Sequence, residues 1–158
     1  MPEKTPAIEE GKPAPDFTLP TVGNRKVSLK DFRGKKVVLY FYPKDNTPGC
    51  TREACGFRDS TEELRAAGAV VLGVSLDGPA SHKRFAGKYS LPFPLLSDEK
   101  AEVSKLYDVY RQKSLYGRKF WGIERSPFII DEAGIIRKIF RKVKVDSHIP
   151  EVFQALTS

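Results

Sequence analysis

The chain has two cysteines, Cys50 and Cys55, and both lie in one short segment, FYPKDNTPGCTREACGFRD (residues 41–59). If Thr47 is the N-cap of a helix and Pro48 its first residue, Cys50 falls in the first turn, where backbone N–H groups are unpaired and the helix dipole is positive. A thiolate is stabilised there, which makes a nucleophile available at neutral pH. Cysteine is also a common small core residue, but the Pro-Gly pair directly before Cys50 favours the nucleophile because it restricts how the backbone approaches the thiol.

The spacing of the two cysteines limits how they can react with each other. Residues five apart on an α-helix are separated by about 140° around the axis and about 7.5 Å along it, so their Cα atoms lie about 8–9 Å apart. A disulfide needs about 4.4–6.8 Å. Cys50 and Cys55 therefore either stay unbridged or form a bridge only after the first turns of the helix unwind. Metal binding is a weaker alternative, because only His82 and His148 remain to complete a site and neither stands in a ligand-spaced motif.

The elements around this segment predict an α/β architecture. Residues 36–42 (KVVLYFY) and 69–75 (AVVLGVS) are apolar runs typical of buried strands. A helix lies between them. Its apolar face consists of Ala54, Phe57, Thr61 and Leu64, spaced by three, four and three residues, and Gly68 ends it. This crossover makes the two strands parallel neighbours and places Cys50 just past the carboxyl end of the first strand, where open α/β sheets bind ligands.

The rest of the chain continues the alternation of strands and helices. The segment FTLPTVGNRKVSL predicts a hairpin around Val22-Gly23-Asn24. Further helices are expected over 79–89, 101–107 and 147–156, and further strands over 93–96, 126–131 and 135–145. Together they predict one domain over residues 1–158, with 1–10 an extended tail and with a central sheet flanked by helices.

Composition excludes several classes of function. The net charge of +7 comes largely from two basic runs, 111–119 and 137–144. No zinc-finger spacing, basic heptad or RNA-binding signature accompanies them, so we interpret them as solvated surface and expect no nucleic-acid partner. The chain shows no signal-peptide pattern and no run of the roughly 18 apolar residues that a membrane span needs. We therefore expect a cytoplasmic protein with no membrane association, in which a cysteine pair is catalytic or metal-binding rather than a structural staple.

The segment PKDNTPGC (residues 43–50) resembles the peroxiredoxin active-site motif, P-x-x-x-[T/S]-x-x-C. The longer FYPKDNTPGCTREACGFRD resembles the peroxiredoxin Q subfamily, also called bacterioferritin comigratory protein, as do GKPAPDFTLP, LLSDEKAEVSKLYDV and SLYGRKFWGIERSPFIIDEAG. The resemblance covers roughly residues 10–155. It implies a thioredoxin-like fold and a thiol peroxidase that uses no metal or prosthetic group.

The resemblance also implies roles for particular residues. Cys50 matches the peroxidatic cysteine, whose thiolate attacks hydrogen peroxide or an organic hydroperoxide and becomes a sulfenic acid. Cys55 matches the resolving cysteine, which forms an intramolecular disulfide that thioredoxin or a similar dithiol protein reduces. Thr47 matches the residue that hydrogen-bonds the peroxide, Pro43 the one that shields the thiolate, and Arg125 the one that stabilises the thiolate and the leaving oxygen. Members of the subfamily are often monomers, although dimers occur, and the sequence does not choose between them.

Four other residues near the motif keep two interpretations each. Glu53, three residues after Cys50, either holds an arginine in place or is an ordinary first-turn glutamate favoured by the helix dipole. Leu115, Phe120 and Trp121 either form apolar walls near the site or pack in the core.

One departure from the subfamily supports a different reaction class. Many relatives have Thr before the Phe of the strand after Arg125, whereas this chain has Ser126-Pro127-Phe128. Thioredoxins carry a cis-proline at the matching place, so a cis Ser126–Pro127 bond is a hypothesis, and a general thiol–disulfide oxidoreductase is an alternative function. The spacing argues against it, since such enzymes use C-x-x-C. A basic nucleic-acid-binding module and an inert thioredoxin-like domain are the remaining alternatives.

Overall fold

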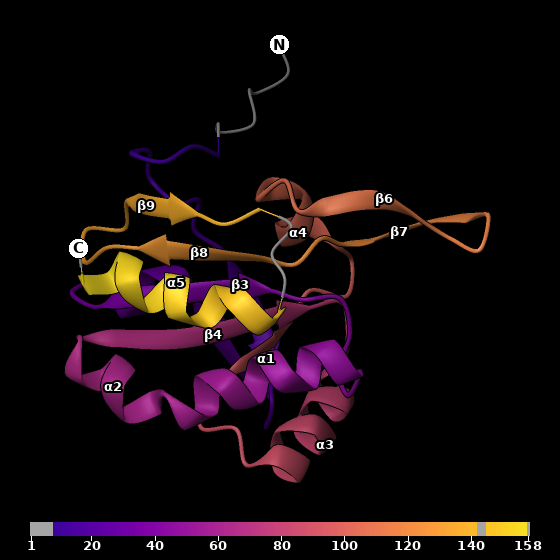
Figure 1. The fold of residues 1–158 in the computed structure, drawn as a ribbon, viewed down its shortest axis with the longest axis horizontal. Coiled ribbons are helices and arrows are strands. Elements are labelled where there is room, and N and C mark those ends of the chain that lie inside the picture. Colours follow the sequence, from indigo (N-terminus) through magenta and orange to yellow (C-terminus); the bar gives the residue numbers. More distant parts are fainter. Residues whose placement is uncertain (1–7, 142–144, 158) are drawn as a thin grey trace.

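The computed structural model describes residues 8–141 and 145–157 (Figure 1). The strands are β1 (Thr18–Thr21), β2 (Arg25–Ser28), β3 (Lys36–Phe41), β4 (Ala69–Ser75), β5 (Leu95–Ser97), β6 (Tyr110–Leu115), β7 (Arg118–Ile123), β8 (Ser126–Ile130) and β9 (Ile136–Ile139). The helices are α1 (Pro48–Asp59), α2 (Thr61–Ala66), α3 (Pro79–Tyr89), α4 (Glu102–Leu106) and α5 (Val145–Thr157), with a 3-10 helix, η1, at Leu29–Phe32.

A five-stranded mixed sheet forms the centre of the molecule, in the order β5-β4-β3-β8-β9. β3 pairs with β4 in parallel, as the crossover helix predicts, and β4 pairs with β5 in parallel. β8 runs antiparallel to β3, and β9 antiparallel to β8. The carboxyl end of β3 therefore lies beside the amino end of β8, with Phe41 opposite Ser126. This register brings the residues just before β8 to the loop that follows β3.

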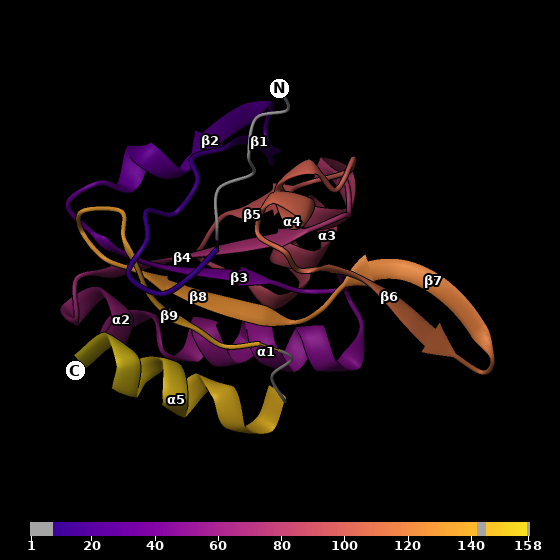
Figure 2. The same ribbon diagram turned by 90° about the horizontal axis from the view of Figure 1, so that it is seen from above.

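Alternate residues of β3 point into two separate cores, as expected of a strand buried on both faces. Val37, Leu39 and Phe41 pack on the side of the β1–β2 hairpin, η1 and α4. Val38, Tyr40 and Tyr42 pack on the side of α1, α2, α3 and α5. Figure 2 shows α1, α2 and α5 on one face of the sheet and the β1–β2 hairpin on the other. The predicted α/β fold, with a central mixed sheet flanked by helices and an N-terminal hairpin, is confirmed.

The boundaries of some predicted elements are wrong. The helix expected to run past Leu64 is broken at Ser60 into α1 and α2. The Thr61 hydroxyl donates to the carbonyl of Arg58 at 2.7 Å, and such side-chain bonds compete with helical pairing. The last strand ends at Ile139 rather than 145, and Val145 already belongs to α5. The single-domain assignment stays a prediction, and most of the tail predicted for residues 1–10 lies outside the described residues.

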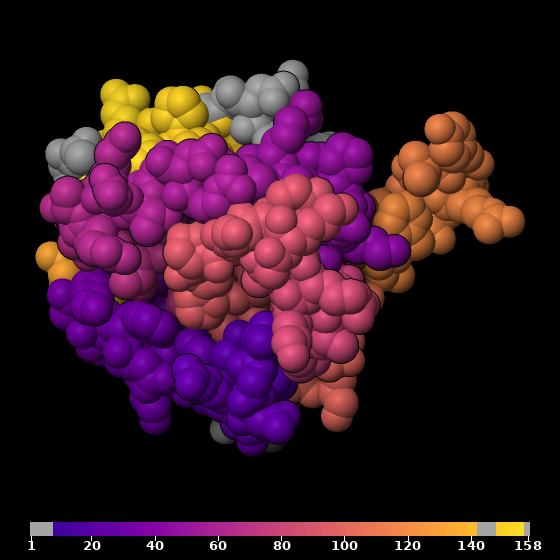
Figure 3. All heavy atoms as spheres, turned by 90° about the horizontal axis from the view of Figure 1, so that it is seen from below, coloured from indigo at the N-terminus to yellow at the C-terminus, as the bar shows by residue number. Residues whose placement is uncertain are grey.

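The sequence analysis did not predict the β6–β7 hairpin, which falls in the first basic run. Among the strands that the structure describes, β6 and β7 pair only with each other, and Figure 3 shows their hairpin as a lobe that projects from the body. Its turn is Tyr116-Gly117, with φ of 51° and 78°. Two consecutive residues with positive φ match the twist of a two-residue hairpin, and glycine adopts this conformation easily. Gly117 between two stretches of β-forming residues is the signal that could have predicted the hairpin.

The hypothesis of a cis Ser126–Pro127 bond is wrong, because this peptide bond is trans. Pro127 stands in the extended β8, opposite Tyr40 of β3, and its carbonyl accepts a hydrogen bond from the backbone N–H of Phe140 at 3.0 Å. The proline is thus an ordinary strand residue. Within residues 8–141 and 145–157, no helix is long and apolar enough to cross a bilayer.

Candidate active site

Cys50 lies in the first turn of α1, at the carboxyl end of β3, and only 1% of it is exposed. Thr47 is the N-cap residue, in the extended conformation, and Pro48 begins the helix, as predicted. The Thr47 hydroxyl, however, donates to the carbonyl of Lys44 at 2.9 Å and does not cap the helix. The loop before the helix thus competes successfully for this hydroxyl. Backbone N–H groups of the first helical turn remain available beside Cys50.

Arg125 bridges Cys50 and Glu53. It precedes β8 by one residue, so the β3–β8 register places it next to the loop after β3. Its Nη2 donates to Cys50 Sγ at 3.2 Å, and its Nη1 donates to Glu53 Oε1. Burial opposes the charge of the guanidinium, but the charges of Glu53 and Cys50 and the hydrogen bonds to them raise the pKa of Arg125 above its ordinary value. The guanidinium therefore stays cationic beside the sulfur.

Glu53 is fully buried and also contacts the C-terminal helix. Of its two interpretations, the one in which it holds an arginine agrees with the structure. Its second oxygen, Oε2, lies 2.7 Å from Nε2 of His148, which is buried in α5 and packs edge-on against Phe57. A carboxylate with no exposed surface needs such partners, because its desolvation is otherwise costly.

Sequence reasoning considered His148 only as a metal ligand and missed its contact with Glu53. The local sequence offers one signal. His148, Val152 and Leu156 are spaced by four residues, and all three are buried, so His148 belongs to the face of α5 that packs on the core. Which residue it meets there depends on how α5 crosses α1, and the spacing carries no information about that.

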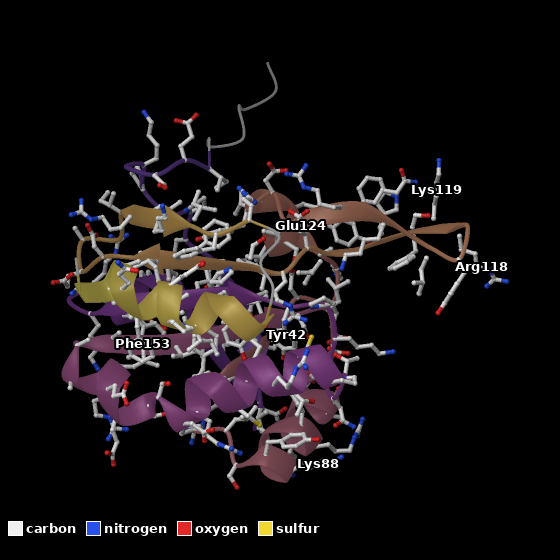
Figure 4. The ribbon with its side chains drawn as sticks, in the orientation of Figure 1. Tyr42, Lys88, Arg118, Lys119, Glu124 and Phe153 are labelled. Carbon is white, nitrogen blue, oxygen red and sulfur yellow. The ribbon has the colours of Figure 1, made fainter. Side chains whose placement is uncertain are left out.

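A second buried polar network holds the loop between β3 and α1. Asp45 accepts hydrogen bonds from the hydroxyls of Tyr42 at 2.5 Å and Ser81 at 2.8 Å, and Nδ1 of His82 lies 2.7 Å from its Oδ2. Its backbone N–H donates to Asp77 at 2.8 Å. Figure 4 labels Tyr42, at the end of β3. These contacts fix the loop that carries two of the predicted site residues, and the sequence analysis did not identify them.

The other predicted site residues lie around the same helix start. Pro43 lies near the start of the loop, two residues after β3, and is half-buried, like Thr47 at its end. Cys55 lies further along α1, half-buried, and both cysteines are free thiols. Because α1 is one unbroken helix from Pro48 to Asp59, the prediction that the two cysteines are held apart in the folded helix is confirmed.

The hairpin residues proposed as walls or core are exposed instead. Leu115 is 57% exposed, Phe120 44% and Trp121 57%, so core packing is wrong for all three. One hairpin residue, Lys113 in the middle of β6, does interact electrostatically with the site. Burial and the positive charge of Arg125 lower the pKa of Lys113, and the charge of Cys50 acts in the opposite direction.

This arrangement is suited to nucleophilic chemistry at sulfur. A buried thiol lies at the positive end of a helix and receives a hydrogen bond from a cation that is itself held by a carboxylate. Such a cation favours the thiolate and can stabilise negative charge on an oxygen that leaves the reacting centre.

Comparisons with known proteins point to one family. Residues 10–139 match the model of the AhpC/TSA family. The chain is 55% identical to a putative peroxiredoxin Bcp of Coxiella burnetii over 146 residues, which are 92% of this chain and 97% of the relative. It is 48% identical to peroxiredoxin Bcp of Bacillus subtilis, over 94% of this chain and 95% of the relative. Among solved structures, PrxQ of Xylella fastidiosa superposes with a TM-score of 0.90 at 36% identity, covering 96% and 97% of the two chains. The bacterioferritin comigratory protein of Xanthomonas campestris has a TM-score of 0.87 at 40% identity, covering 90% and 89%.

Proposed function

The chain belongs to the AhpC/TSA family, within it to the peroxiredoxins of the Q or Bcp type, and is a thiol peroxidase; on that premise we propose which of its residues carry the reaction. Cys50 is the peroxidatic cysteine. Its thiolate attacks one oxygen of a hydroperoxide, the O–O bond breaks, and the products are the sulfenic acid of Cys50 and water or an alcohol. The observation that carries this assignment is the hydrogen bond from Arg125 to Cys50 Sγ at 3.2 Å.

Three neighbouring residues support the first step. Arg125 stabilises both the thiolate and the negative charge that develops on the departing oxygen. Thr47 lies three residues before Cys50, and its hydroxyl forms a hydrogen bond with the bound peroxide. For that, the hydroxyl keeps its acceptor lone pairs available while it donates to the carbonyl of Lys44. Pro43, at the far end of the same loop, shields the thiolate from water.

Cys55 resolves the sulfenic acid, and α1 must change for this to happen. The Cys55 thiolate attacks the sulfur of the Cys50 sulfenic acid, hydroxide leaves and is protonated to water, and a disulfide forms. On intact α1 the two Cα atoms are about 8–9 Å apart, beyond the range of a disulfide. The first turns of α1 therefore unwind after oxidation, which also breaks the contacts of Glu53 with Arg125 and His148.

The substrate is a hydroperoxide and the reductant is of the thioredoxin type. The Xanthomonas protein is described by its alkyl peroxide reduction activity. We therefore propose that this chain reduces organic hydroperoxides as well as hydrogen peroxide. A cytoplasmic location and a monomer, with a dimer as the alternative, also stay proposals.

Intact mass and free thiols after one equivalent of hydrogen peroxide test these roles. The wild type is expected to lose both thiols rapidly and 2 mass units, as a disulfide forms. Cys55→Ser should instead gain 16 mass units, as a stable sulfenic acid, while Cys50→Ser should keep its Cys55 thiol. These masses follow from the oxidation ladder, at about 2 Da for a disulfide and about 16 Da for each oxygen. If Cys50→Ser loses its thiol as fast as the wild type, Cys50 is not the residue that reacts first.

A further inference from the structure

The β6–β7 hairpin carries exposed apolar side chains in an unusual concentration. Among the residues that the structure describes, the large apolar side chains that are exposed all lie on it. They are Leu115, Tyr116, Phe120 and Trp121. A two-stranded ribbon has little core of its own, so apolar groups at its surface contribute little to folding. Apolar groups gathered in this way typically mark an interaction site.

One face of the hairpin combines two of these apolar side chains, Leu115 and Phe120, with basic ones. Lys113 pairs with Phe120, and Leu115 pairs with Arg118. Because side chains alternate across a strand, these four residues share one face with Arg111, and Lys119 and Trp121 lie on the other. We call the first set, Arg111, Lys113, Leu115, Arg118 and Phe120, the basic hairpin face. Residues 110–123 contain no aspartate or glutamate.

The basic hairpin face is close to the active site at Lys113 and extends away from the body toward the turn of the hairpin. Lys113 lies midway along β6, is half-buried, and feels the charges of Arg125 and Cys50. Figure 4 shows Arg118 and Lys119 at the far end of the hairpin, away from the central sheet. From Ile123 to Arg118 the strand extends by about 17 Å at 3.3–3.4 Å per residue. A small hydroperoxide at Cys50 cannot reach this tip, whereas a protein surface can span both ends.

The charge of the face selects among protein partners. If two copies of this chain met through it, each would bring three basic residues, of which Arg111 is paired with Asp108 at 3.0 Å, and the remaining like charges would repel. An acidic partner would be attracted instead, and its encounter with the chain would be accelerated. Leu115 and Phe120 supply the apolar contact between the basic groups.

We propose that the basic hairpin face is the docking surface for the acidic face of the dithiol protein that reduces the Cys50–Cys55 disulfide. This inference rests on the function proposed above. In the reaction, a thiolate of the partner attacks one sulfur of the bridge and forms a mixed disulfide. The second thiolate of the partner then attacks the mixed disulfide and releases this chain, and the partner leaves as a disulfide. Cys50 and Cys55 thereby gain two electrons and take up two protons.

The chain offers a matched pair of double variants for the test. Arg118→Glu with Phe120→Ser alters the basic hairpin face, and Lys119→Glu with Trp121→Ser makes the same kind of change on the neighbouring residues of the opposite face. Each is assayed with an acidic bacterial thioredoxin, kept reduced by its reductase and NADPH, and separately with dithiothreitol. The rate at which one equivalent of hydrogen peroxide oxidises each variant is measured by quenching samples at successive times and determining the intact mass of the protein. Circular dichroism and hydrogen exchange of residues 110–123 establish that the hairpin is formed.

The face variant is expected to lose about tenfold or more in kcat/KM for thioredoxin, the order expected when a steering charge is reversed. Its reduction by dithiothreitol and its oxidation by peroxide should stay within twofold of the wild type, and the opposite-face variant should match the wild type throughout. High salt should lower the wild-type value with thioredoxin toward that of the face variant.

Other results would overturn the proposal. If both variants lose thioredoxin activity equally, or neither loses it, the basic hairpin face is not the docking surface. If the face variant is slow only with a long-chain alkyl hydroperoxide, the face binds substrate. If the wild type sediments as a dimer that the face variant dissociates, the face is an interface between copies. A wild type that peroxide does not oxidise at Cys50 would instead refute the proposed function, whatever the hairpin does.

Discussion

The substitution Glu53→Gln distinguishes two ways in which Glu53 can affect the reactivity of Cys50: by holding Arg125 in position, or through its negative charge alone. The change keeps the volume of the fully buried side chain and removes its charge. If charge alone mattered, losing an anion near Cys50 would favour the thiolate and speed its reaction with peroxide. If Glu53 matters because it holds the guanidinium against Cys50 Sγ, the same change slows the reaction. The sign of the effect therefore decides between the two.

The structure favours a slower reaction. A hydrogen bond to a charged group is worth about 1.5–3 kcal/mol and a neutral one about 1 kcal/mol, so the arginine is held less firmly by about 0.5–2 kcal/mol. If that loss appears in the transition state, oxidation of Cys50 slows by about 2- to 30-fold. Arg125 is only 14% exposed at its side chain, so water screens this interaction little.

Quenching at successive times after mixing with hydrogen peroxide, followed by intact mass, measures the rate at which Cys50 is oxidised. Glu124→Gln is the control, because it removes the half-buried carboxylate that precedes Arg125 in the chain. It should change the rate by less than about twofold. A Glu53→Gln variant that reacts as fast as the wild type, or faster, would refute the positioning role of Glu53.

Two further predictions concern stability. Replacing His148 by Leu leaves the buried Glu53 carboxylate without that contact and should lower the free energy of unfolding of the reduced protein by about 3 kcal/mol. His148→Gln should restore part of the lost stability, and the difference in stability between His148→Leu and His148→Gln should vanish when Glu53 is Gln. Urea unfolding measures all of these stabilities. If His148→Leu is as stable as the wild type, the contact does not have this role. The second prediction concerns three tyrosines whose pKa burial raises, Tyr40, Tyr42 and Tyr107. Above pH 10 they ionise in the unfolded chain but stay neutral in the folded one, so their stabilising effect is complete below pH 10 and is lost as the pH rises. From the linkage relation, these three groups should lower the free energy of unfolding by about 4 kcal/mol between pH 9 and pH 11. Urea unfolding over that range, with tyrosinate absorbance at 295 nm, tests this; native protein that already absorbs as tyrosinate at pH 11 would show that the three hydroxyls are not protected.

Local sequence was sufficient for the elements whose signals are short in range. The apolar runs of β3 and β4 and the crossover between them determined that these strands are parallel neighbours. The Thr-Pro start of α1 placed Cys50 in the first turn, and helical geometry alone separated it from Cys55. The residue pattern of the motif then indicated the family, with Cys50 and Arg125 as partners.

Tertiary structure decided which partners the polar side chains choose. The Thr47 hydroxyl could cap the helix or bond its own loop, and it bonds Lys44. Glu53 meets both Arg125 and His148 only because β8 pairs with β3 and α5 packs on α1. These contacts join residues that are far apart in the chain, so their energies depend on packing that no local pattern encodes.

The β6–β7 hairpin and Pro127 are two further features that local sequence did not predict. Residues 110–123 form a ribbon that extends from the body, although their charges suggested only a solvated surface. Pro127 takes a trans bond because β8 lies extended between β3 and β9. The sequence by itself predicted a candidate nucleophile and determined its helix and the separation of the two thiols, because backbone geometry and propensity act over a few residues. Only the tertiary structure decided which cation and carboxylate surround Cys50 and which surface stands beside it, because those depend on how distant strands and helices pair.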